Sequence, residues 1–168
     1  MKLQTLVLLT FVLLILPAGV SALATYSGGQ VVIDEPVHDD LFVSGGMIEI
    51  TAPVDSVIAA GGTIIIDAPV AGDVIAAGGS IRVNDRIGGK LVAAGGDITV
   101  NGDIGTNAVL TGGTVRIGDT VTVSRDAIIS GGQVFHAGHV TGNLTVRAQN
   151  FDNQGTAGNL DVVLSDPG

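Results

Sequence analysis

The chain contains no cysteine and no tryptophan, and aromatic residues make up only 3% of its 168 positions. The absence of cysteine excludes disulfide bridges, thiolate metal sites, a cysteine nucleophile and a lipidated cysteine anchor. The shortage of aromatic residues argues against a roomy ligand pocket, because such pockets are usually lined by aromatic side chains. We therefore expect a narrow core packed from valine, isoleucine, leucine and alanine.

Positive charge is also scarce in this sequence. Seven Lys and Arg residues stand against 16 Asp and Glu residues, which gives a net charge of −9. Because a nucleic-acid binder needs a basic surface to neutralise phosphates, we expect no nucleic-acid partner. Apolar residues reach 46% and charged residues only 14%, a composition that excludes a disordered chain.

The N-terminal segment, residues 1–24, has the pattern of a secretory signal peptide. A basic start at Lys2 precedes the apolar stretch Leu3–Leu16, and small residues favour cleavage after Ala24 or, in a second register, after Ala22. The alternative is an uncleaved anchor, because residues 3–24 are long enough to span a bilayer, which needs about 20 apolar residues. Both interpretations predict export to an extracytoplasmic place in the cell envelope.

The remainder, residues 25–168, is expected to be a single repeat domain. Gly-Gly pairs recur in it at nearly constant intervals, and a fixed short period decides the architecture before any other pattern. The longest repeat inserts two residues around Val121–Val123, which keeps every later side chain on its own face. The pairs begin at Gly28, Gly45, Gly61, Gly78, Gly95, Gly112 and Gly131.

Within one repeat the apolar residues alternate with a period of two, which is typical of β-strands, and longer steps turn corners. Short strands that return to the same place in every repeat describe one coil of a β-solenoid. We therefore predict an all-β, single-stranded solenoid with about eight coils of ~17 residues, about 35–40 Å long at the ~4.8 Å spacing of paired strands. The inward residues of one coil are expected to be Ile64, Ile66, Val70, Val74 and Ala76, followed by Ile81 of the next coil.

Several columns of residues are expected to stack at the corners. The Gly-Gly pairs permit positive φ and close backbone approach, prolines lie where no ladder hydrogen bond is donated, and Asp or Asn side chains bond the nearby backbone. Ion pairs one coil apart are expected between Asp73 and Lys90 and between Arg86 and Asp103. The proline column is Pro36, Pro53 and Pro69, and the Asp/Asn column is Asp34, Asp67, Asn84 and Asn101.

Each coil is expected to contain a pair of inward residues with one outward residue between them. Where the first member of the pair is small, as at Ala108, the second is large, as at Leu110, and such compensation is expected in a close-packed interior. The intervening residues then form an exposed apolar stripe of the kind that marks association surfaces. The opposite assignment, with this column as core, stays open. The stripe is Phe42, Ile58, Ile75, Val92, Val109 and Ile128, followed by Thr145.

The sequence step Gly72-Asp73-Val74-Ile75-Ala76 is repeated in part by the segments 142–144 and 158–160. With these short Gly-rich coils, residues 27–164 resemble the bactofilin family of polymer-forming cytoskeletal proteins. The resemblance implies a right-handed β-helix of triangular cross-section that assembles end to end into filaments without nucleotide or cofactor. Many bactofilins are cytoplasmic, so the export signal favours a scaffold in the cell envelope.

Motifs that carry catalysis are missing from the sequence. It has no Gly-x-Ser-x-Gly elbow, no phosphate loop and no His-Glu-x-x-His, and no pair of carboxylates repeats as a glycosidase would need. His136 and His139 form the one clustered histidine pair, and without a third ligand they predict no metal site. His136 falls in the column of Ile117 and is expected to be a neutral core imidazole, unless a local slip turns Phe135 inward. We expect no enzyme, no metal and no cofactor.

The leading expectation for function is therefore a non-enzymatic, self-associating scaffold whose partners are other copies of the chain, envelope components or the membrane. Solenoid ends leave unpaired strand edges to which another chain can add. Val31 and Ile33 of the first coil are the predicted end-to-end contact, because the polar coil at residues 147–163 is expected to act as a cap. The alternative is a surface adhesin or polysaccharide-binding solenoid. A carbohydrate-active β-helix and a hexapeptide acyltransferase fit less well, since neither loop-borne sites nor a strict six-residue step is present.

Overall fold

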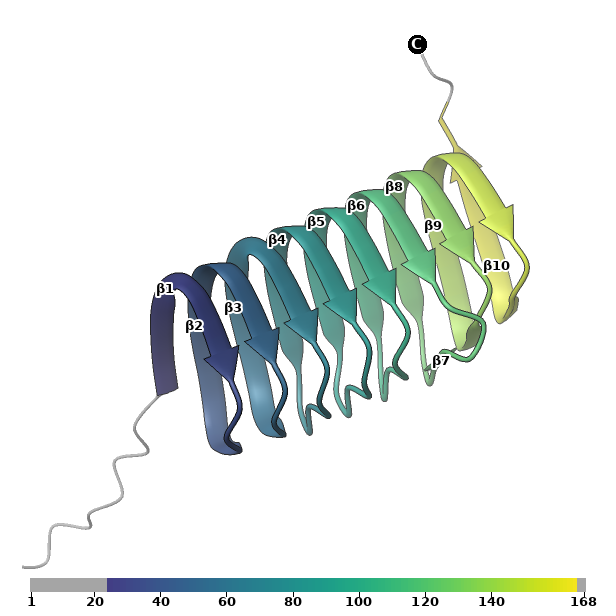
Figure 1. The fold of residues 1–168 in the computed structure, drawn as a ribbon. Helices are drawn as coiled ribbons and strands as arrows, with labels where there is room; N and C mark the ends of the chain where they lie inside the picture. Colours follow the sequence, from purple (N-terminus) through teal and green to yellow (C-terminus); the bar gives the residue numbers. More distant parts are fainter. Residues whose placement is uncertain (1–23, 166–168) are drawn as a thin grey trace, which may run out of the picture.

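In the computed structural model, residues 24–165 form one β-solenoid that winds into a straight rod (Figure 1). The predicted signal peptide or anchor lies outside these described residues, apart from Ala24. Between residues 24 and 165, no helix is long and apolar enough to cross a membrane.

The strands stack in sequence order and all their pairings are parallel. The ladder runs β1-β2-β3-β4-β5-β6-β8-β9-β10, and the short β7 pairs with β9. This arrangement confirms the predicted all-β solenoid, with about eight coils of the length that the Gly-Gly spacing predicts. The strands are β1 (Ala24–Ile33), β2 (Val37–Ile50), β3 (Val54–Ile66), β4 (Val74–Val83), β5 (Leu91–Val100), β6 (Ala108–Ile117), β7 (Thr122–Val123), β8 (Ala127–His136), β9 (His139–Asn153) and β10 (Thr156–Leu164).

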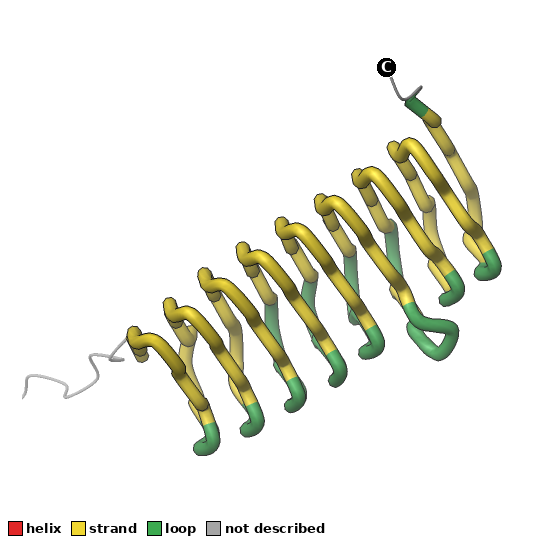
Figure 2. Tube along the Cα trace, turned by 45° about the horizontal axis from the view of Figure 1, so that its top comes forward, coloured by secondary structure: helices red, strands yellow, loops and turns green. Residues whose placement is uncertain are grey.

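Each coil has three sides, and each side forms its own parallel ladder along the rod. On the first side, Val74–Ala77 of β4 pairs with Leu91–Ala94 of β5, and on the second side Ser80–Val83 pairs with Asp97–Val100. The third side is joined mostly by single bridges, of which Val70↔Ile87 is one. Strands such as β4 and β5 bend from the first side to the second at their Gly-Gly pairs, so one continuous strand covers two sides (Figure 2). The longer β2, β3 and β9 also include residues of the third side.

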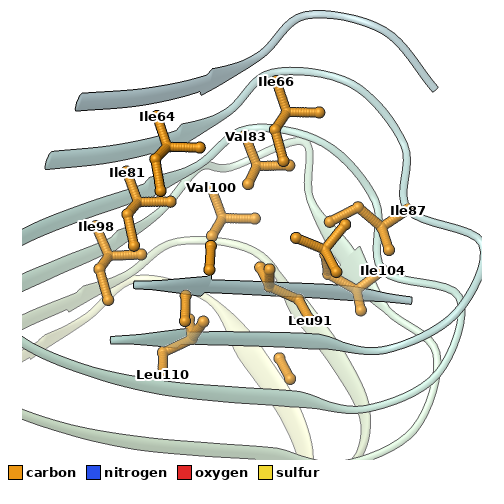
Figure 3. Close-up of a cluster of buried hydrophobic side chains, with 14 of the residues drawn as sticks. Ile64, Ile66, Ile81, Val83, Ile87, Leu91, Ile98, Val100, Ile104 and Leu110 are labelled. Carbon is orange, nitrogen blue, oxygen red and sulfur yellow. The ribbon is translucent and has the colours of Figure 1, made fainter. Parts of the chain in front are cut away.

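The core is a stack of thin aliphatic layers, one from each coil. The predicted inward residues of the third coil are all buried, with exposed fractions of 3% or less. Along the rod Ile64, Ile81 and Ile98 form one column, and Ile66, Val83 and Val100 form the next (Figure 3). Branched side chains stacked on similar neighbours one coil away pack this interior closely.

The two-residue insertion is absorbed in one wider loop, which Figure 2 shows after β6. The N–H of Val121 bonds the carbonyl oxygen of Gly118 at 3.3 Å and closes this loop. Val121 and Val123 are both buried, and Ala127 returns to the inward column of Ala108. The prediction that the insertion preserves the alternation is confirmed.

The Gly-Gly corners lie where the sequence places them, but the expectation of positive φ was wrong. None of the glycines in the described part of the chain has a positive φ. The corners need glycine because successive coils approach closely there. A Cβ atom at Gly78 would lie 2.6 Å from the carbonyl oxygen of Gly61, and one at Gly95 would lie 2.6 Å from that of Gly78.

The Asp/Asn column stacks as predicted, but its side chains bond one another instead of the nearby backbone. The Asn101 amide donates to the Asn84 side-chain oxygen at 2.9 Å, and the Asn84 amide donates to the Asp67 carboxylate at 2.6 Å. Thr51 separates Asp67 from Asp34 in this column. The side chains prefer each other because coil stacking brings amide donors and oxygen acceptors into register.

Of the two predicted ion pairs, one forms. Lys90 Nζ lies 3.3 Å from the Asp73 carboxylate, whereas Arg86 and Asp103 make no ion pair in the described structure, so that prediction was wrong. The Asp103 carboxylate accepts the backbone N–H of Thr122 at 2.7 Å instead. A fixed backbone donor in the next coil competes well with a flexible arginine exposed to water.

The polar coil predicted as a cap, residues 147–163, includes most of β10. Residues 156–164 form β10, which pairs in parallel with β9 through Leu160↔Leu144 and Val162↔Val146. The alternation of apolar residues therefore continues past the polar stretch. Because β10 pairs with β9 only as far as Ala148, residues 150–153 remain the last layer of the second side among the described residues.

Candidate functional site

The predicted apolar stripe lies on the outer surface of the first side. Ile58, Ile75 and Ile128 are 40–46% exposed, and their neighbours in the chain point inward. Val109 is 38% exposed, while Phe42 and Val92 are half-buried. The alternative in which this column forms the core is excluded by these exposures.

A second outward column lies beside the stripe, two residues further along each strand, and the sequence analysis missed it. Its members are small: alanine in the central coils, serine or threonine toward the ends. Small residues at exposed positions are common in proteins, so they do not by themselves indicate a functional surface. Between the two columns near the N-terminal end is a hollow of about 220 Å³, whose lining includes Phe42, Ser44, Ile58 and Ala60. The small-residue column is Ser27, Ser44, Ala60, Ala77, Ala94, Thr111 and Ser130.

At the N-terminal end of the rod, Val31 and Ile33 fill the core of the first coil and are 8% and 3% exposed. Substitution at either position would therefore disturb the coil as well as any joint at this end. Tyr26, which lies in the inward column of Val43, is 44% exposed and offers more surface to a partner.

At the C-terminal end, β10 exposes apolar side chains in inward columns. Leu160 continues the buried column of Leu144 yet is 44% exposed, and Leu164 is 61% exposed. A hollow of about 430 Å³ beside Leu164 is lined in part by Phe151 and Leu164. This end therefore offers more apolar surface than the polar composition of residues 147–163 suggests.

His136 is the one buried polar side chain within residues 24–165, at 1% exposure. Its Nε2 lies 3.4 Å from the Thr156 carbonyl oxygen, and its Nδ1 has no hydrogen-bond partner. Burial lowers the pKa of His136, the bond to Thr156 opposes that shift, and the charge of His139 adds to it. The predicted core position of His136 is thus confirmed, and the lowered pKa favours the neutral imidazole. Phe135 does not turn inward but lies under the Arg116 guanidinium at 4.9 Å.

His139 is exposed, and it contacts the same residue as His136, namely Thr156. Its Nδ1 is 2.7 Å from the Thr156 hydroxyl. Across the part of the chain that the structure describes, no three His, Asp or Glu side chains gather closely enough to hold a metal ion.

At another corner, just before the first side of a coil, Asp side chains accept hydrogen bonds from the backbone of the next coil. The Asp73 carboxylate accepts the N–H of Lys90 at 2.9 Å, and the Asp126 carboxylate accepts the N–H of Asn143 at 2.8 Å. The Lys90 N–H is the main cause that lowers the pKa of Asp73 below its usual value, and the Lys90 ammonium adds to it. An Asp at this position, with or without a preceding glycine, therefore links one coil to the next.

Comparison of the chain with family models, with curated proteins and with solved structures gives no match.

Proposed function

We propose that residues 25–168 form a non-enzymatic structural scaffold of the cell envelope, which assembles from copies of this chain through the ends of the solenoid. Each coil already pairs with a near-copy of itself along the three sides. A strand edge of a second copy offers the same backbone donors and acceptors. The proposed partners are therefore other copies, with envelope components or the membrane as the surroundings.

The observation that carries this proposal is the uncovered apolar surface of β10. Leu160 lies in a column whose members from β2 to β9 are buried, and yet 44% of it is exposed. Covering one leucine side chain stabilises a joint by about 1.5–3 kcal/mol. A joint that also covers Val162 and Leu164 can offset the loss of free motion on association.

Two features of the sequence support a polymer outside the cytoplasm. Residues 1–24 have the pattern of an export signal. The resemblance of residues 27–164 to bactofilins favours nucleotide-free assembly, with no cofactor and no catalytic residue.

The test compares two variants of β10 in residues 25–168. Leu160→Asp places a charge in the column that a stacked copy would cover, and Val163→Asp places the same charge on the outer face of the same strand, where Val163 is 51% exposed. We expect wild type and Val163→Asp to form large assemblies in sedimentation and negative-stain microscopy, with or without EDTA. Leu160→Asp should require a much higher concentration.

Circular dichroism checks that both variants keep the strand content of the wild type. Wild-type protein that remains monomeric at high concentration and moderate salt would overturn the scaffold proposal and favour the adhesin alternative. Equal assembly by the two variants would show that growth does not use β10.

A further inference from the structure

The first side of the rod carries two adjacent columns without charge, and we call them together the apolar face. One column is the large-residue stripe from Phe42 to Ile128, and the other is the small-residue column from Ser27 to Ser130. The columns are two residues apart along each strand, which is about 7 Å. The face ends at β9, where Thr145 and Arg147 take the two positions.

The chemistry of the apolar face narrows what can cover it. It carries no basic residue to attract an anionic lipid surface and no aromatic platform apart from Phe42. The large residues of the face recur every ~4.8 Å, which is the spacing of stacked strands. A second copy of this chain has that same repeat and the same uncharged composition.

We propose that a second copy packs on the apolar face, so that two rods lie side by side and point in the same direction. The direction follows from the order of the columns. When two such faces meet around a two-fold axis parallel to the rods, the large column of each lies opposite the small column of the other, so Ile75 meets Ala77 of the second copy. Ridges then fit into grooves, as in close-packed sheets.

Opposite directions give a poorer fit. A two-fold axis perpendicular to the rods places large residues on large and small on small, so that Ile75 meets Val92 while Ala77 and Ala94 leave a gap. Gaps between packed sheets lose dispersion contacts. The hollow lined by Phe42, Ser44, Ile58 and Ala60 marks where the large residues of a parallel copy fit over small ones.

The area of the apolar face predicts that two single molecules associate weakly through it. Seven coils of ~4.8 Å and four residues of ~3.3 Å give about 450 Å² per molecule. Two such faces bury about 900 Å² together, which is below the ~1,200 Å² of a typical stable interface. The contact is therefore transient between single molecules and becomes strong when many copies are aligned. The pair itself does not depend on the end-to-end assembly proposed above.

Cysteine trapping tests both the face and the direction, and the natural chain has no cysteine to interfere. Ile75→Cys, Ala77→Cys and Val92→Cys are made separately in the Leu160→Asp background, which removes end-to-end growth from the readout. Each position faces outward on the first side. Mixtures are oxidised with copper phenanthroline, and disulfide-linked dimers are identified by mass spectrometry. A fourth variant, Asp97→Cys on the second side, reports random collision.

We expect the mixture of Ile75→Cys and Ala77→Cys to give several-fold more mixed dimer than either variant gives with Asp97→Cys. A dominant dimer of Ile75→Cys with Val92→Cys would overturn the parallel direction. Yields no greater than those with Asp97→Cys would overturn the apolar face as a contact between copies. Sedimentation of the protein with phosphatidylcholine vesicles, abolished by Ile75→Asp, would assign the face to lipid instead.

Discussion

Val74 and Ile75 are neighbours in β4 with opposite surroundings, since Val74 is fully buried and Ile75 is 43% exposed. A carboxylate at position 74 would enter an aliphatic layer with no partner, and it would either lose its hydration or remain protonated. We expect Val74→Asp to lower the free energy of unfolding by more than ~3 kcal/mol. Ile75→Asp should stay within about 1 kcal/mol of the wild type. Chemical denaturation of both variants measures the difference, and the reverse ranking would contradict the assignment of the two faces.

The buried imidazole of His136 predicts a stability that depends on pH. Burial lowers its pKa in the folded state, whereas the unfolded chain takes up the proton near pH 6.5. Below that pH the unfolded state binds more protons than the folded state, so the free energy of unfolding falls as the pH decreases. The slope approaches about 1.4 kcal/mol per pH unit at most. Denaturation between about pH 7.5 and 5.5 measures it, above the range where carboxylates titrate.

The matched control for that prediction is His136→Val, because valine occupies the same column at Val83 and Val100. This variant should retain the strand content and show a flatter pH profile than the wild type. An unchanged slope would mean that a group other than His136 causes the pH dependence.

At the scale of the strand, the Gly-Gly corners set how closely the coils approach. A Cβ at Gly78 would lie 2.6 Å from a backbone carbonyl oxygen, whereas one at Gly29 would meet no atom within 4 Å. We expect Gly78→Ala to lower the free energy of unfolding by about 1–3 kcal/mol, as overpacking does. Gly29→Ala should be neutral or slightly stabilising, because it restricts the unfolded chain. Thermal melting compares the two, and equal effects would show that close approach is not what the glycines provide.

The corners between strands show why side-chain roles are harder to predict than strand positions. The sequence predicts Asp103 beside Arg86, and the two do lie one coil apart, but the carboxylate bonds the N–H of Thr122. Asp73 makes both the predicted ion pair and a backbone bond to Lys90. Opposite charges in one column identify residues that are neighbours. Which donor the carboxylate bonds, a side chain or a backbone N–H, is visible only in three dimensions.

For the whole rod, each coil contacts only the coils beside it, so stability is approximately a sum over neighbours. Deleting residues 77–93 removes one complete coil and joins Ala76 to Ala94, which continues the same alternation. We expect this shorter rod to fold with a cooperative melt. Deleting Asn84 alone puts the residues that follow it out of register by one and removes a side chain that bonds both Asp67 and Asn101, so it should destabilise the rod more than the deletion of a complete coil. Equal damage from the two deletions, by circular dichroism and melting, would contradict independent coils.

The sequence alone was sufficient for the path of the chain. A period of two inside a short, nearly constant repeat leaves only stacked short strands, so the inward positions from Ile64 to Ala76 and the outward stripe at Ile75 are correct. Size compensation between Ala108 and Leu110 is a constraint of close packing, and it is readable wherever a repeat lets equivalent positions be compared.

Tertiary structure decided what lies next to what across the coils. Three features depend on distances between residues one coil apart. They are the close approach that requires glycine at the corners, the amide ladder of Asn84 and Asn101, and the small-residue column at Ala77 beside Ile75. The exposure of Leu160 is of the same kind, because its own sequence alternates like every buried coil and only the stacking order leaves it uncovered. Alternation specifies the face of a strand on which a residue lies. What covers that face is set by the next layer of the fold, which local sequence does not encode.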